Sequence, residues 1–135
     1  MRWQHSQRRR TNAGNVLLDY QGSEGFDKMP WTADGKTLWD YLKMLTPTIL
    51  SSAKIERLGE STREKCDWCA RELGEEVPVI VVPTDVGKWP YAREGAVLID
   101  DSPFNAITWQ LYGGLFVLHT SVDYTIALIK ELLAV

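Results

Sequence analysis

Residues 96–105 have the sequence AVLIDDSPFN, in which an apolar run ends in two adjacent aspartates, Asp100 and Asp101. An unbroken apolar run is typical of a strand that is buried on both faces of a parallel sheet. In such sheets the functional residues lie just past the carboxyl ends of the strands, so the aspartate pair is the leading candidate for a functional site. The alternative is an ordinary strand-to-helix turn in which an aspartate caps the following helix.

Short apolar runs alternate with helical patterns along the rest of the chain. Strands are expected at 16–20, 48–51, 78–82, 96–100 and 115–119, and helices at 35–45, 61–74, 103–112 and 122–133. Ser61 and Glu64 form a capping-box pattern at the start of the second helix, and Gly74 is a stop signal at its end. Because parallel strands need crossover connections, the pattern predicts an α/β fold, a three-layer sandwich around one five-stranded, parallel, Rossmann-like sheet.

Length and composition limit the class of protein. The chain has 135 residues, about one domain, and 44% of them are hydrophobic, which is enough for one packed core. No apolar run approaches the roughly 18 residues that a membrane span needs, so we expect no membrane partner. Two cysteines do not make a disulfide framework, which favours a reducing, cytoplasmic compartment.

The charge is unevenly distributed along the chain. The net charge is −3, yet residues 1–10 contain four arginines and no acid, so the remainder carries 11 basic and 18 acidic groups. A domain this acidic is a poor general partner for nucleic acid, except through phosphorylated ends. The basic stretch has no apolar segment of the kind that a secretory signal needs. We expect residues 1–15 to form a flexible basic tail and residues 16–135 to form one domain.

Polar residues follow four of the predicted strands, and the topology of a parallel sheet brings them to one edge. They are Asp19, Ser51, Ser52, Lys88, Asp100 and Asp101. Crowded carboxylates repel each other unless a cation lies between them, and Mg²⁺ takes one or two carboxylates together with substrate phosphate oxygens. A hydroxyl and a lysine suit the remaining phosphate oxygens, and an aspartate can attack phosphorus to form an aspartyl-phosphate. The set therefore predicts Mg²⁺-assisted phosphoryl transfer.

The order of these motifs resembles the haloacid dehalogenase (HAD) superfamily. Its four motifs correspond to VLLDYQGS at 16–23, TILS at 48–51, GK at 87–88 and VLIDDSPFN at 97–105. MPWTADGKTLW at 29–39 and GGLFVLHT at 113–120 are similar to its nucleotidase-like branch, which includes 5′(3′)-deoxyribonucleotidases. The resemblance covers residues 26–135 well. It implies a HAD core and a Mg²⁺-dependent phosphomonoester hydrolase that acts on a small phosphorylated substrate, with nucleotides favoured.

The resemblance also implies roles around the metal. Asp19 would be the nucleophile and a metal ligand, and the backbone carbonyl of Gln21 and the carboxylate of Asp100 would complete the protein's ligands to Mg²⁺. Asp101 would support these ligands, and Asn105 would brace the loop.

The remaining roles concern the phosphoryl group. Ser51 and Ser52 would hold it, and Lys88 would neutralise charge in the transition state and orient the aspartates. Taken singly, Ser51 could instead be a turn serine and Lys88 a solvated surface lysine.

The sequence departs from the family pattern in two places. Phosphatases of the family carry a second aspartate two residues after the nucleophile, and Gln21, which cannot exchange a proton, stands there. General acid–base catalysis is worth about 10²–10⁴-fold, so slow turnover or a long-lived phospho-enzyme is expected. Only residues 23–29 stand where relatives have a cap of a few tens of residues. Two interpretations stay open: an enzyme without a cap, or a catalytically inactive module, with a binding or assembly role, in which 16–22 only mimics the first motif.

Other residues have a structural and a functional interpretation. Cys66 and Cys69 form a CxxC pattern inside a predicted helix, where core packing is favoured over redox or metal chemistry. His119 ends an apolar run and is interpreted as structural. Trp31 and Trp89 are expected to flank the mouth of the site, where they either stack on a base or mark an apolar surface that pairs with another chain. A homo-oligomer therefore also stays open.

Overall fold

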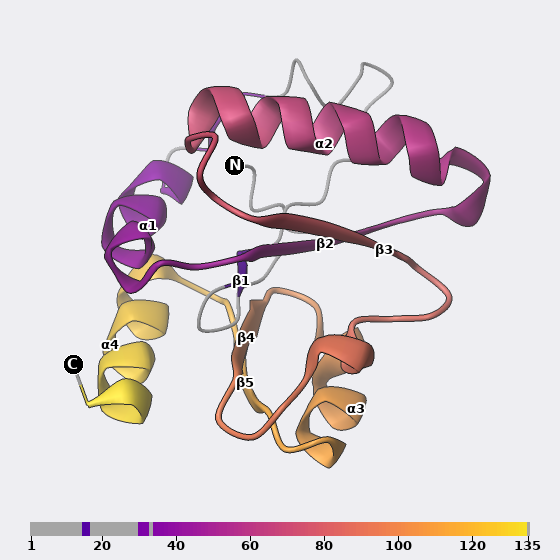
Figure 1. The fold of residues 1–135 in the computed structure, drawn as a ribbon. Helices are drawn as coiled ribbons and strands as arrows, with labels where there is room; N and C mark the ends of the chain where they lie inside the picture. Colours follow the sequence, from indigo (N-terminus) through magenta and orange to yellow (C-terminus); the bar gives the residue numbers. More distant parts are fainter. Residues whose placement is uncertain (1–14, 17–29, 33, 135) are drawn as a thin grey trace.

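The computed structural model describes residues 15–16, 30–32 and 34–134 (Figure 1). The strands are β1 (Asn15–Val16), β2 (Ile49–Ala53), β3 (Val79–Pro83), β4 (Val97–Asp100) and β5 (Leu115–Leu118). The helices are α1 (Gly35–Leu42), α2 (Leu58–Glu72), α3 (Ala106–Leu111) and α4 (Val122–Leu133), with short 3-10 turns η2 (Lys43–Leu45), η3 (Ile55–Arg57), η4 (Trp89–Tyr91) and η5 (Pro103–Asn105). The predicted alternation of strands and helices is confirmed. The predicted tail at 1–15, except Asn15, and the predicted first-strand residues 17–20 lie outside the described residues.

The strands form two parallel sheets, so the prediction of one five-stranded parallel sheet sandwich is wrong. One sheet has three strands in the order β1-β4-β5, and the other consists of β2 and β3. β1 lies near β2, but no ladder joins them in the described part of the chain. In Figure 1 the β2–β3 pair runs across the direction of β4 and β5. Apolar runs predict where strands occur, whereas pairing depends on hydrogen bonds between distant backbones.

Helices cover both faces of these strands, and two apolar cores result. In β4, Val97 and Ile99 face a core made with α1, α2 and α4, whereas Leu98 faces a second core that contains Trp109 of α3. Neighbouring residues of β2 divide in the same way, with Ile49 in the first core and Leu50 in the second. The expectation of strands buried on both faces is therefore confirmed for β4. No helix in the described ranges is long and apolar enough to cross a membrane.

The second helix begins earlier than its capping-box pattern predicts. η3 leads directly into α2, whose N-cap is Arg57, so Ser61 lies one turn inside the helix and its predicted capping role is wrong. The end of the helix is confirmed. Gly74 follows with a φ of +124°, a left-handed conformation that glycine adopts without strain.

Trp31 ties the residues before α1 to the far end of α2. Its indole Nε1–H donates a hydrogen bond to Glu72 Oε1 at 2.8 Å, and its ring lies 5.3 Å from the ring of Trp68, centroid to centroid. Because α2 leaves the carboxyl end of β2 and runs back along the sheet, Glu72 lies away from the edge that holds the site. The prediction that Trp31 flanks the mouth of the site is therefore wrong.

We expect Glu72→Gln to lower the free energy of unfolding by up to about 1 kcal/mol at pH 7, because the amide oxygen still accepts from Trp31 but carries no charge, and to have a smaller effect near pH 3. The hydrogen bond from Trp31, with a smaller contribution from Arg71, lowers the pKa of Glu72 below its ordinary value of 4.5. A carboxyl with a lowered pKa stabilises the fold above its unfolded-state pKa, and this contribution is lost as the pH falls through the folded-state value. Urea unfolding at both pH values measures the difference. The exposed Glu131→Gln serves as the control, and equal losses for Glu72→Gln at both pH values would contradict the prediction.

Candidate functional site

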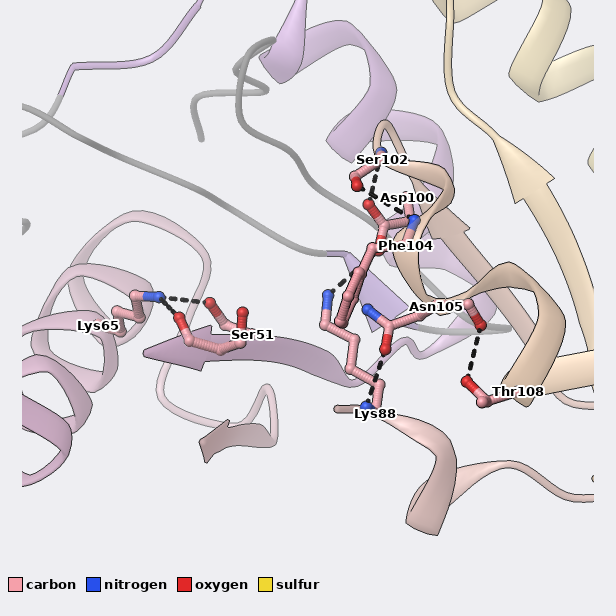
Figure 2. Close-up of polar contacts among 9 residues, drawn as sticks. Ser51, Lys65, Lys88, Asp100, Ser102, Phe104, Asn105 and Thr108 are labelled. Atoms are coloured by element: carbon pink, nitrogen blue, oxygen red, sulfur yellow. Dashed lines mark hydrogen bonds and ion pairs between the residues drawn. The ribbon is translucent and has the colours of Figure 1, made fainter. Parts of the chain in front are cut away.

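The centre of the candidate site is a buried ion pair between Lys88 and Asp100 (Figure 2). Lys88 Nζ lies 3.4 Å from Asp100 Oδ2, and the two side chains are 0% and 1% exposed. Asp100 is the last residue of β4, and Lys88 directly precedes η4. Removing two charges from water costs several kcal/mol per ion, which makes a buried pair a poor device for stability alone. Its position at the carboxyl end of a parallel strand favours a functional interpretation.

Hydrogen bonds hold both members of the pair in place. The backbone N–H of Ser102 donates to Asp100 Oδ1 at 2.8 Å, and the backbone N–H of Lys88 donates to Asn105 Oδ1 at 3.1 Å. Gly87 has a φ of +90°, and a Cβ there would lie 3.2 Å from Asn105 Oδ1. The glycine therefore allows the loop to approach Asn105, which braces it as predicted.

Ser51 is held by a lysine from the helix that follows its strand. Lys65 Nζ of α2 donates to Ser51 Oγ at 2.7 Å and to the carbonyl oxygen of Ser52 at 2.6 Å. Both Lys65 and Ser51 are buried. An ammonium only donates, so Ser51 Oγ accepts from it, and the Ser51 hydroxyl hydrogen must be directed to a different acceptor. Figure 2 shows this group set apart from the Lys88–Asp100 pair.

Sequence reasoning missed Lys65, because a lysine in a helix usually lies on the solvated face. A signal was nevertheless present. Lys65 precedes Trp68 and Cys69 by three and four positions, so it shares a helix face with two residues that are completely buried. A lysine on the apolar face of a helix next to a strand-end serine indicates a buried, hydrogen-bonded cation.

Of the other predicted site residues, two lie in the described part of the chain and two lie outside it. Asp101 and Ser52 are half-buried next to Asp100 and Ser51. Asp19 and Gln21 lie outside the described residues. β1 pairs in parallel with β4 through Val16 and Ile99, so the described end of β1 lies beside the residue that precedes Asp100.

The chemistry of the donor set fits a hard cation. Asp100 and Asp101 offer carboxylate oxygens, and Mg²⁺ is commonly bound through one or two carboxylates in addition to waters and substrate phosphates. Among the described residues there is no group of three or more His, Cys, Asp or Glu side chains that could hold a metal ion. A magnesium site here therefore requires oxygen ligands from the first predicted motif or from the substrate.

The two cysteines lie in α2. Burial raises the pKa of Cys69 to about 12, and the nearby Cys66 adds to this. Burial also raises the pKa of Cys66, with a contribution from the charge of Asp67. Both thiols stay protonated at neutral pH, and a protonated thiol is a poor nucleophile and metal ligand. This environment supports the core-packing interpretation.

His119 is buried inside the protein, whereas Trp89 is partly exposed to solvent. His119 is buried after β5, and its Nδ1 lies 2.6 Å from Thr125 Oγ1 in α4, a contact that supports a structural role. Trp89 follows Lys88 directly and is 38% exposed. Its ring stacks on that of Tyr112 with centroids 4.9 Å apart.

A scan against protein-family models, a search of curated proteins and a search of solved structures each find no match to this chain. Membership of the haloacid dehalogenase superfamily therefore stays a prediction that depends on the motifs. The function must therefore be inferred from the geometry of the residues at the strand ends.

Proposed function

We propose that the protein is a Mg²⁺-dependent phosphomonoester hydrolase that acts through an aspartyl-phosphate. The buried Lys88–Asp100 pair at the end of β4 carries the proposal. An ammonium kept out of water at a strand end matches the needs of a reaction in which a dianionic phosphate gains further negative charge, and the carboxylate beside it would bind the cation that the reaction needs. The strand-end position of Ser51 and the motif order add support.

The proposed reaction proceeds in two steps at Asp19. A carboxylate oxygen of Asp19 attacks phosphorus and forms a new O–P bond while the bond from phosphorus to the substrate oxygen breaks. Water then hydrolyses the aspartyl-phosphate, which releases phosphate and restores Asp19. Because Gln21 cannot donate a proton, the leaving oxygen takes its proton from solvent, and turnover is slow.

The other residues bind and orient the phosphoryl group. Asp100, Asp19 and the backbone carbonyl of Gln21 would hold Mg²⁺, which would neutralise charge on the phosphoryl oxygens. The Ser51 hydroxyl donates to one phosphoryl oxygen, and Lys65 holds that hydroxyl in place. Lys88 neutralises charge in the transition state and orients Asp100. The substrate is a small phosphorylated molecule, with nucleotides favoured only by the resemblance.

Phosphate release from nitrophenyl phosphate and a panel of nucleoside monophosphates, with and without Mg²⁺, tests the proposal. We expect slow, Mg²⁺-dependent release that falls by on the order of 10³-fold or more in Asp19→Asn, because the nucleophile is lost. We also expect Mg²⁺ to raise the melting temperature of the wild type but not of Asp100→Asn. Release that is unaffected by Asp19→Asn would contradict the proposed nucleophile.

The glutamine at position 21, which cannot exchange a proton, favours a second candidate function. In this candidate the protein is a catalytically inactive module with a binding or assembly role. A chain that has lost its general acid and carries only residues 23–29 in place of a cap could retain the fold alone. This candidate predicts neither phosphate release nor a phospho-enzyme, and no thermal stabilisation by millimolar Mg²⁺. Those three results together would exclude the hydrolase.

We expect Lys65→Met to lower kcat/KM by about 10–100-fold, because one hydrogen bond to a charged group is worth about 1.5–3 kcal/mol. Without the ammonium, the Ser51 hydroxyl can turn away from the phosphoryl group. Steady-state kinetics on nitrophenyl phosphate measure the effect, and thermal unfolding shows whether the variant is folded. The exposed Lys54→Met is the matched control, and unchanged kinetics in a folded Lys65→Met variant would contradict the positioning role.

A further inference from the structure

α3 carries apolar side chains on two opposite faces. Trp109 is completely buried in the second core, whereas Phe104, Ile107 and Leu111 are 70%, 78% and 74% exposed. Phe104 belongs to η5, which leads into α3, and the three residues are spaced three and four positions apart, so they form one stripe. A helix with apolar side chains on opposite faces is typically covered by other parts of the protein, or by a partner, on both sides. Figure 1 shows α3 on the opposite side of the molecule from α1 and α4.

The stripe continues into neighbouring apolar residues. Tyr112, which follows Leu111, is 53% exposed and stacks on the partly exposed Trp89. We call this set of five the α3 face: Trp89, Phe104, Ile107, Leu111 and Tyr112.

The size of the α3 face matches one side of a stable interface. From the exposed fractions, the five residues present on the order of 700 Å², since a large aromatic side chain alone has about 150–250 Å². The largest apolar patch of a typical monomer is about 300–600 Å². A standard interface buries about 800 Å² on each partner.

We propose that the α3 face is the interface between two copies of this chain in a twofold dimer. None of its five residues is charged. Interfaces of transient complexes are about as apolar as ordinary protein surface, whereas homodimer interfaces are more apolar, which favours a second copy as the partner. In a twofold dimer the same face meets itself, and an uncharged face does so without repulsion. The proposal is independent of the proposed function.

The molar mass in solution tests the proposal, measured by light scattering during gel filtration at about 10 and 100 µM. We expect the wild type at the higher concentration to have twice the chain mass of 15.4 kDa. Ile107→Glu/Leu111→Glu places four carboxylates in the interface and should be monomeric with an unchanged circular dichroism spectrum. Met44→Glu is the matched control, because Met44 is 77% exposed in η2, outside the α3 face. It should remain dimeric.

Two results would overturn the proposal. A monomeric wild type at 100 µM would show that no second copy covers the α3 face, whatever else does. A dimer that persists in folded Ile107→Glu/Leu111→Glu would place the interface elsewhere. Should that double variant not fold, Phe104→Arg decides in its place, because Phe104 lies in η5, outside α3.

Discussion

Lys88→Met is expected to lower the free energy of unfolding by about 3–5 kcal/mol, the typical cost of removing one partner from a buried ion pair. Asp100 is 1% exposed, and its Oδ2 lies 3.4 Å from the Lys88 ammonium. Methionine fills similar volume but leaves the carboxylate in a poorly solvated position without that cation. Urea unfolding at pH 7 measures the loss.

Two further variants separate the charge effect from packing. Lys54→Met, at an exposed position, should change the free energy of unfolding by less than about 0.5 kcal/mol. Lys88→Met/Asp100→Asn removes both charges while the asparagine oxygen can still accept from the Ser102 N–H, so we expect it to recover most of the loss. A double variant as unstable as Lys88→Met would attribute the loss to packing of the lysine side chain and contradict the ion-pair explanation.

Gln21→Asp is expected to raise the turnover of nucleoside monophosphates by about 10²–10⁴-fold, the usual contribution of general acid–base catalysis. The proposed wild-type reaction has no carboxyl group at this position to protonate the leaving oxygen or to activate water. The gain should be larger for a nucleoside monophosphate than for nitrophenyl phosphate, because a sugar oxygen leaves poorly without a proton. Steady-state kinetics on both substrates measure the difference.

Gln21→Asn is the matched control, since it shortens the side chain as Gln21→Asp does but adds no ionisable group. It should leave turnover unchanged. An active protein in which Gln21→Asp brings no gain would show that the proton comes from a different group. Inactivity of both the wild type and Gln21→Asp would favour the non-catalytic module.

Most elements of the fold could be predicted from local patterns. The final helix was predicted at 122–133 and is found at Val122–Leu133, because its apolar spacing and the residues around it are local signals. The start of α2 was misplaced because η3 extends the helical path before Ser61. The single five-stranded sheet was wrong because an apolar run indicates a strand without specifying its partner.

The candidate site was predictable where its residues directly follow strands. Asp100 and Lys88 were identified from their positions at strand ends, and their contact joins the loop after β3 to the end of β4. Lys65 was missed because its partner Ser51 precedes it by 14 residues across a turn, and a helical lysine gives no sign of burial unless its face is considered. Trp31 was misplaced for the same reason, since its partner Glu72 is 41 residues away.

The sequence by itself determined which segments are strands and helices and which of them are apolar enough to be buried. Those properties depend on neighbours a few positions apart along the chain. Only the tertiary structure decided how the strands divide into two sheets, that Lys65 and Lys88 are buried, and that one face of α3 stays uncovered. These properties depend on contacts between residues that are distant in the chain, and such contacts form only when the backbones of different elements pack together.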